Sequence, residues 1–201
     1  LEPCGMTEIK AYKPSTNSLS EGQVLAEPYS YDKARIIVAE MADSLVFQLT
    51  DKGLVTDGLT LDVGYDRENC DKGSYRGPVH IDHYGRSVPK GTHGSTHFGN
   101  ATNLGSTIVT AAVELFDRIA NRSLTVRRIT IAANRVVQDE GVYQFDLFSD
   151  VKKQEKEKNL QKAMLGIKKK YGKNAILKGT NFLDGATMRE RNKQIGGHKE
   201  S

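Results

Sequence analysis

The chain has 201 residues, of which 37% are hydrophobic and 27% are charged. This length allows one domain with a buried core and an appendage, and no apolar run is long enough to span a membrane. The two cysteines, Cys4 and Cys70, exclude a disulfide framework, so the cytoplasm is the expected location.

Charge is distributed unevenly along the chain, although the formal net charge is only +4. Residues 1–150 hold 15 Lys and Arg against 20 Asp and Glu, whereas residues 151–201 hold 14 against 5. The body therefore has a net charge of −5 and the tail a net charge of +9. A basic tail on an acidic body favours a polyanionic partner.

The first half of the chain predicts a linker, a strand, a helix and a second strand. Pro and Gly punctuate residues 1–16, which is typical of a linker. A short strand is expected over residues 20–27, and an amphipathic helix over residues 31–52, capped by Ser30 or Asp32 and stopped by Gly53. Its inward positions recur at helical spacing: Ala34, Ile37, Val38, Met41 and Leu45. Residues 58–66 alternate as a half-buried strand does, with Leu59, Leu61, Val63 and Tyr65 on one side.

The second half predicts a strand, a helix and a last strand after a Gly-rich loop over residues 67–90. An irregular strand is expected over residues 91–100, and a helix over residues 106–121 with Ile108, Ala112, Leu115 and Ile119 inward. In the strand over residues 124–135, Val126 differs in parity from Ile129 and Ile131, which predicts a bulge at Arg127-Arg128. The order βαββαβ predicts an α+β fold, a split βαβ ferredoxin-like sandwich whose four-stranded sheet carries two helices on one face.

The tail begins with a segment dense in Lys and Glu. A surface helix is expected over residues 151–171, and its narrow apolar stripe consists of Leu160, Ala163, Met164 and Ile167. Residues 172–201 are polar and Gly-containing, and the sequence predicts no regular structure for them. The expected organisation is a linker over residues 1–16, a domain over residues 17–140 and a basic helical C-terminal tail over residues 141–201.

A peptide of five residues lies between the last strand and the tail helix: Gln144, Phe145, Asp146, Leu147 and Phe148. A polar Gln followed by a Leu-Phe pair suits an extended peptide that fills an apolar groove on another protein. Burial of the Leu and Phe side chains contributes roughly 1.5–3 kcal/mol each before ordering costs. The pattern resembles the peptide by which bacterial DNA polymerases bind the sliding clamp. The alternative is that Phe145 and Leu147 finish a strand and pack in the core.

Two enzymatic or metal-binding interpretations are weaker. His80, His83, His93 and His97, with Cys70 nearby, have spacings that can ligate zinc, but no CxxC pair accompanies them, so no metal is expected. A Ser/His/Asp hydrolase is disfavoured because no GxSxG motif is present.

Several segments together resemble the C-terminal region of Y-family translesion DNA polymerases, of the ImpB/MucB/SamB (UmuC-like) branch of Gram-positive bacteria. The segments are KPSTNSLSEGQVL (13–25), TLDVGYDRE (60–68), DHYGRSVPKGTHGST (82–96), QFDLF (144–148) and ERNKQIGGHKE (190–200). This resemblance implies a little finger (polymerase-associated) domain, whose open sheet grips the phosphates of primer–template duplex, and a partner sliding clamp. Residues 1–16 would then be the end of the thumb domain and its linker.

The resemblance also implies which residues contact DNA, through phosphates and without sequence readout. The matching positions are Ser18, Ser20, Gly22 and Gln23 on the first strand, Lys90, His93, Ser95 and Thr96 at the third, and Arg127, Arg128 and Asn134 on the fourth. Asp62 and Asp66 depart from this pattern, because carboxylates on the open face would repel phosphate.

The same resemblance implies that this chain is not itself an enzyme. The catalytic palm, with its Mg²⁺ and deoxynucleotide sites, would precede Leu1 in a longer DNA polymerase of the DNA-damage (SOS) response, so no cofactor is expected here. The alternative is a free-standing ferredoxin-like RNA-binding or interaction domain. An RNA-binding sandwich stacks bases on aromatic residues of its central strands, and here only Tyr65 is available, on the core-facing side.

Overall fold

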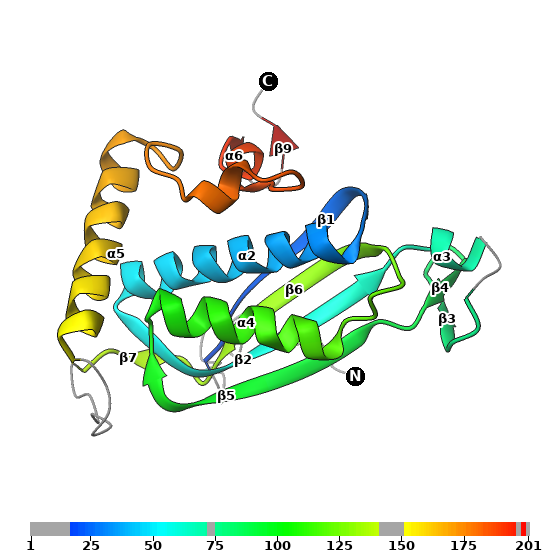
Figure 1. Ribbon diagram of the computed structural model, residues 1–201, viewed down its shortest axis with the longest axis horizontal. Helices are drawn as coiled ribbons and strands as arrows, with labels where there is room; N and C mark the ends of the chain where they lie inside the picture. Colours follow the sequence, from blue (N-terminus) through cyan, green and yellow to red (C-terminus); the bar gives the residue numbers. More distant parts are fainter. Residues whose placement is uncertain (1–16, 72–74, 141–150, 196–197, 200–201) are drawn as a thin grey trace, which may run out of the picture.

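The computed structural model describes residues 17–71, 75–140, 151–195 and 198–199. Its body is an antiparallel sheet with two long helices against one face (Figure 1). The strands are β1 (Leu19–Tyr29), β2 (Leu54–Tyr65), β5 (Thr92–Thr102) and β6 (Val126–Asn134), and the helices are α2 (Tyr31–Lys52) and α4 (Gly105–Ile119). A short β7 (Val137–Gln138) pairs with the start of β2.

The strand order in the sheet is β1-β6-β2-β5, and every neighbouring pair is antiparallel. The last strand therefore lies between the first and the second, and each helix crosses over one intervening strand. This arrangement confirms the predicted α+β class and the βαββαβ order with two helices on one face. The first strand, β1, occupies one edge of the sheet, and β5 occupies the other.

Helix α2 begins and ends where the sequence predicts. The Ser30 side chain accepts a hydrogen bond from the backbone N–H of Lys33, and Gly53 ends the helix with a left-handed φ of 63°. All five of its predicted inward residues are buried, together with Val46 and Leu49. The helix thus supplies the largest share of the apolar surface that covers the sheet.

Helix α4 packs closely on β5. Phe116 is fully buried, although the sequence pattern did not single it out, whereas the predicted Ile119 is only partly buried. A Cβ atom at Gly94 would lie 2.8 Å from Cγ2 of Ile119, so the strand needs glycine where the helix crosses it.

The alternation of β2 and the bulge in β6 are both confirmed. Leu59, Leu61, Val63 and Tyr65 are buried under the helices. Gly64 pairs with Arg128 and Tyr65 with Val126, so Arg127 is the extra residue of a bulge. Because of this insertion, Val126 and Ile129 both face the core although they are three residues apart.

Residues 67–90, predicted as a loop, contain regular elements. They form a short helix α3 (Glu68–Asp71) and a hairpin of β3 (Val79–Ile81) and β4 (Ser87–Pro89). We call residues 78–90 the arm. Its base is closed by the Lys90 N–H, which donates to the carbonyl of Pro78 over 2.8 Å.

Helix α5 (Val151–Tyr171) confirms the predicted tail helix, but the predicted apolar stripe does not form its buried side. Leu160 is 60% exposed, and Ala163 and Ile167 are exposed too, so only Met164 of the four is half-buried, in the pocket beside α2. The helix contacts the body through polar groups instead: Gln161 accepts from the Gly105 N–H over 2.8 Å, and Glu157 accepts from the Ser106 N–H over 2.6 Å. These groups cap helix α4, which has no side-chain cap of its own.

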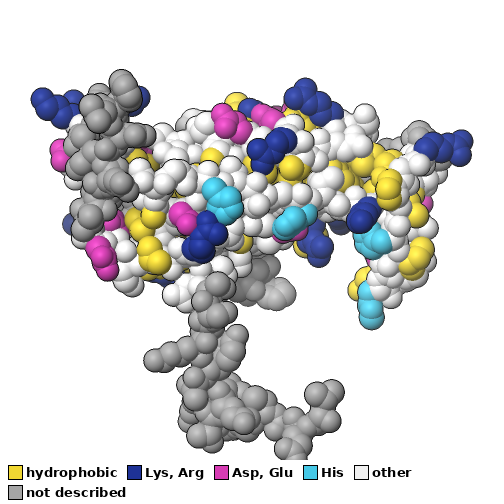
Figure 2. All heavy atoms as spheres, turned by 90° about the horizontal axis from the view of Figure 1, so that it is seen from below, with side chains coloured by type: hydrophobic (Ala, Val, Ile, Leu, Met, Phe, Trp, Pro, Cys, Tyr) yellow, Lys and Arg dark blue, Asp and Glu magenta, His cyan; other side chains and the backbone are white. Residues whose placement is uncertain are grey.

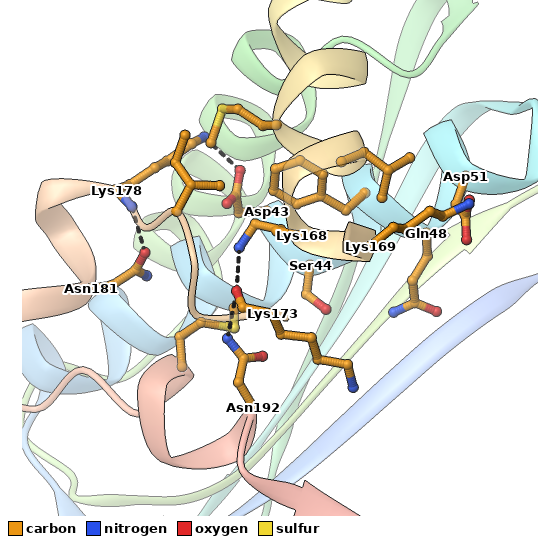
Figure 3. Close-up of a pocket in the computed structure, with 15 residues that line it drawn as sticks. Asp43, Ser44, Gln48, Asp51, Lys168, Lys169, Lys173, Lys178, Asn181 and Asn192 are labelled. Carbon is orange, nitrogen blue, oxygen red and sulfur yellow. Dashed lines mark hydrogen bonds and ion pairs between the residues drawn. The ribbon is translucent and has the colours of Figure 1, made fainter. Parts of the chain in front are cut away.

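The C-terminal segment, to which the sequence assigned no structure, packs on the flank of α2 opposite α4 and also contacts Glu21 and Gln23 of β1 (Figure 1). It contains a 3-10 turn η1 (Gly179–Phe182), a short helix α6 (Met188–Arg191) and the two-residue strands β8 (Gln194–Ile195) and β9 (His198–Lys199). A pocket of about 390 Å³ separates this segment from α2 and α5. Figure 3 shows lysine and asparagine side chains around the pocket rim.

The buried carboxylate of Glu40 on α2 anchors the segment. Glu40 is 2% exposed, and it accepts hydrogen bonds from the Asn181 amide over 2.8 Å and from the N–H groups of Thr187 and Met188 over 2.8 and 3.0 Å. Hydrogen bonds to a charged group in a buried site contribute roughly 1.5–3 kcal/mol each. One side chain therefore holds two separate turns of the C-terminal segment.

Helices α2 and α4 are joined at their outer surface by Asp117. Its carboxylate accepts from the Arg35 guanidinium over 2.9 Å and from the Tyr31 hydroxyl over 2.6 Å. The hydrogen bond from Arg35, and a further one from Tyr31, hold the pKa of Asp117 below its ordinary value. No helix in the described part of the chain has the length and apolar character needed to cross a membrane.

We predict that Glu40→Ala releases the C-terminal segment from α2 while the sheet and its two helices stay folded. Hydrogen exchange of residues 179–193 should accelerate strongly, and the exchange of β2 and β6 should change little. The matched control is Glu114→Ala on the exposed side of α4. Unchanged protection of residues 179–193 in Glu40→Ala would contradict the anchoring role.

We predict that Asp117→Asn destabilises the protein by about 1 kcal/mol at neutral pH, because the paired groups are partly exposed. The native pKa of Asp117 is depressed, so its contribution is present above the unfolded value near 3.8 and is lost as the pH falls through the native value. The difference in melting temperature between variant and parent should therefore shrink in acid. Asp184→Asn, at a more exposed pair with Lys33, is the control.

Candidate nucleic-acid interface

The sheet face opposite the helices is formed by alternate residues of four strands. The registers align these residues in rows across the sheet, because Gly22 pairs with Thr130, which pairs with Asp62, which pairs with His93. The next row contains Ser20, Ala132, Thr60 and Ser95. Most of these side chains are small, so the backbone of a bound polymer can approach the sheet closely.

Arg128 is the main cation of this face. It is exposed, and its side chain lies across Gly64, where a Cβ atom would be 3.4 Å from Cβ of Arg128. No carboxylate of the described residues pairs with it. Its guanidinium is therefore available to a phosphate, which it can bind with two parallel hydrogen bonds.

Arg127, predicted as an equal contributor, is already engaged within the protein. Its guanidinium donates to the carbonyl of Ala26 over 3.0 Å and lies 3.6 Å from the carboxylate of Asp66. The contact bridges a register shift between Val24 and Tyr29 of β1. Arg127 thus stabilises the irregular end of the first strand.

The two carboxylates that would repel phosphate both have partners. Asp62 lies on the open face, and its Oδ1 is 2.6 Å from Nδ1 of His93. Asp66 lies beyond the end of β2, where its side chain accepts from the Glu68 N–H over 2.9 Å and pairs with Arg127. The charge of Asp66 is therefore balanced by Arg127, whereas that of Asp62 is balanced only when His93 is protonated.

Two of the predicted DNA-contacting residues point to the other face of the sheet. Gln23 pairs with Ile129 and donates to Thr187 Oγ1 over 2.9 Å, so its side chain faces the C-terminal segment. Thr96 pairs with Leu59 and faces the helices. Because successive strand residues alternate between faces, the predicted phosphate contacts of Gln23 and Thr96 could come only from their backbone groups.

The other predicted residues lie on or next to the open face. Ser18 is exposed just before β1, and Lys90 is exposed at the base of the arm. Asn134 donates to Thr60 Oγ1 over 2.8 Å, which places both side chains at one end of the face. Beside them, Arg135 contacts Asp57 Oδ2 over 2.6 Å and His97 Nδ1 over 2.8 Å. The peptide Gln144–Phe148 lies outside the described residues.

A groove of about 750 Å³ separates the arm from the open face. Its sheet wall includes Val24, Asp62, Gly64, His93 and Arg128, and its arm wall includes His80, Tyr84, Arg86 and Val88. Figure 2 views the protein from the β5 side and shows the arm standing out at the right-hand end, with a recess between it and the body. Basic, acidic and histidine side chains are interspersed over this view.

Sequence reasoning missed the arm and the hydroxyl-bearing residues Thr60 and Thr130. The strand alternation already implied the two threonines, because they share parity with Asp62 and Arg128. The arm had only a weak signal, since Val79, Ile81 and Val88 are separated by a polar turn. Over the described ranges, no three His, Cys, Asp or Glu side chains gather closely enough to hold a metal ion.

The comparisons with known proteins agree with this fold. Residues 16–147 match the model of the impB/mucB/samB family C-terminal domain. A curated relative, "DNA polymerase IV 2" of Halalkalibacterium halodurans, is 30% identical over 111 residues, which cover 55% of this chain and 26% of the relative. The chain thus spans about a quarter of the length of that relative.

Two solved structures are similar at low identity. A complex of the beta-clamp processivity factor with the little finger domain of PolIV is 10% identical, with a TM-score of 0.39 over 66% of this chain and 100% of that chain. An insertion ternary complex of Dbh DNA polymerase is 14% identical, with a TM-score of 0.32 over 65% of this chain and 33% of that chain. At these TM-scores neither likeness carries weight, and the assignment rests on the family model. Because that model covers well over half of the chain, the chain belongs to the impB/mucB/samB family, and residues 16–147 match the C-terminal domain of that family.

Proposed function

We propose that this chain is the DNA-holding module of a Y-family translesion DNA polymerase. The open sheet face would bind the sugar–phosphate backbone of primer–template duplex without reading the base sequence. The observation that carries this proposal is the composition of the face: rows of mostly Gly, Ser, Thr and Ala residues, with the Asp62–His93 pair, around Arg128, which pairs with no carboxylate of the described residues.

The chemistry of the face suits phosphate and not base recognition. Hydroxyl groups, backbone N–H groups of an edge strand and guanidinium groups bind phosphate oxygens, and such contacts carry no sequence information. A polymerase that copies past damaged bases must bind DNA in this sequence-independent way. The face also lacks Phe, Tyr and Trp on the described strands, which disfavours single-stranded RNA as the ligand.

We propose that the described residues act together with the palm domain of such a polymerase, where DNA is synthesised. Mg²⁺ and deoxynucleotides would bind at that palm, and the described residues would act only by holding the duplex behind it. By this proposal the fragment has no nucleotidyltransferase activity of its own.

We also propose that Gln144–Phe148 binds the sliding clamp. The support is the pattern itself, because Leu147 and Phe148 follow a polar Gln at the spacing of an extended groove-binding peptide. The peptide lies between two described elements, β7 and α5, at the border of the domain. Binding there would raise the effective concentration of the polymerase at clamp-loaded primer ends.

We predict that Arg128→Ala weakens binding to primer–template duplex regardless of sequence. Four phosphate contacts give a slope of roughly −3 to −4 for log affinity against log salt concentration, and loss of one contact reduces it by about 1. Fluorescence anisotropy over a salt series measures both quantities. Arg189→Ala, an exposed arginine on the C-terminal segment, should leave them unchanged. Equal slopes for Arg128→Ala and the parent, or tighter binding to single-stranded RNA than to duplex, would refute the proposal.

We predict that the double variant Leu147→Ala, Phe148→Ala loses capture by immobilised sliding clamp, because the two side chains carry the apolar burial. Affinity for duplex should stay at the parent value. The control is Phe182→Ala, Leu183→Ala, a neighbouring Phe-Leu pair that is 62% and 52% exposed in the described structure. Clamp capture that survives in the first variant, or disappears equally in the control, would contradict the assignment.

A further inference from the structure

The arm has a turn that is held rigidly by one carboxylate. Asp82 accepts hydrogen bonds from the N–H groups of Tyr84 and Arg86 over 2.9 and 3.0 Å, and from Nε of Arg86 over 2.8 Å. Gly85 completes the turn with a left-handed φ of 74°. The hydrogen bonds from Arg86 lower the pKa of Asp82 to about 2, so the carboxylate stays ionised at neutral pH.

This rigid turn presents an aromatic ring to solvent. Tyr84 is 77% exposed, and the guanidinium of Arg86 lies over the ring at 4.7 Å from its centroid. The His83 ring meets it edge-on at 5.4 Å. With Arg86 on one face and most of the residue exposed, the opposite face of the ring is open to a flat partner.

The groove beside Tyr84 has an excess of available positive charge. Its four arginines outnumber its three carboxylates, of which Asp66 pairs with Arg127 and Asp82 with Arg86, while the contact of Asp62 with His93 balances charge only when the imidazole is protonated. Two further lining residues, Arg67 and Arg128, pair with no carboxylate in the part of the chain that the structure describes. The groove therefore combines unpaired guanidinium groups on one wall with an aromatic face on the other.

We propose that this groove binds a single-stranded DNA segment that continues from the duplex, with one base stacked on Tyr84 and its phosphates at Arg128 and Arg67. The proposal rests on the proposed function, because it takes the duplex to lie on the adjoining sheet face. It adds a separate site and a separate ligand, since the arm would contact an unpaired nucleotide and not the duplex.

A single strand matches the groove better than the alternatives do. Single-stranded sites pair a cationic track with aromatic platforms on which bases stack, and an arginine behind the ring adds a cation–π contribution. In a duplex the base faces are already stacked on one another, so Tyr84 would gain no partner. A single strand supplies both groups that the groove suits, phosphates for the guanidinium groups and a flat base for the ring, whereas a protein partner supplies no phosphate.

The test measures, by fluorescence anisotropy, the affinity of the protein for a blunt DNA hairpin and for the same hairpin with a short single-stranded extension. The extension is placed on the 5′ strand end in one hairpin and on the 3′ strand end in another. The extension should raise affinity by roughly fivefold to a hundredfold, as one stacked base does. Tyr84→Leu should abolish that gain, Tyr84→Phe should keep it, and both should bind the blunt hairpin as the parent does.

Phe182→Leu is the matched control, because Phe182 is an exposed ring covered by the guanidinium of Arg189 at 4.8 Å, outside the groove. It should retain the full gain. No gain from the extension, or a gain that survives in Tyr84→Leu, overturns the inference even if the blunt hairpin binds. Failure of the blunt hairpin to bind the parent protein overturns the proposed function instead, and a Tyr84-dependent affinity for the single strand would still support this site.

Discussion

The alternation of strand residues between two faces governs this structure, and one inserted residue in β6 reverses it locally. Arg127 is the extra residue, and because of it Val126 before the bulge and Ile129 after the bulge both face the core. A regular strand through this point would have turned an arginine into the core in either register, Arg128 if Val126 stayed inward or Arg127 if Ile129 did. The bulge instead sends Arg128 outward and leaves Arg127 to stabilise the edge strand β1.

Polar contacts, and not apolar stripes, attach the C-terminal part of the chain to this sandwich. Glu157 and Gln161 of α5 satisfy the free N–H groups at the start of α4, and Glu40 of α2 satisfies those at the start of α6. The first N–H groups of any helix have no acceptor within the helix, and each of these contacts supplies one. The carboxylate of Glu40 would be costly to bury alone, so the C-terminal segment and this anchor depend on each other.

Much of the fold could be predicted because local signals agreed with long-range ones. Ser30 and Gly53 mark the two ends of α2, and the alternation of apolar residues in β2 shows which of its faces lies in the core. The docking of α5 could not be predicted, because the polar residue Gln161 is buried only through its hydrogen bond with the start of α4, which lies far away in the sequence. For the interface, the family resemblance gave residues of both faces: Ser20, Gly22 and Arg128 lie on the open face, whereas the side chains of Gln23 and Thr96 do not. The arm was missed because three-residue strands leave little periodicity to detect.

The anchoring of α5 has a consequence for any partner of the peptide Gln144–Phe148. Asp139 N–H donates to the carbonyl of Gly53 over 2.8 Å, and α5 begins at Val151, so the intervening residues are tethered at both ends. A fully stretched chain spans at most about 3.6 Å per residue, which limits the excursion of such a loop to roughly 20 Å from its two attachment points. If the proposed clamp contact is made at Gln144–Phe148, the number of residues between Asp139 and Val151 would therefore set the largest distance between the clamp and the open sheet face.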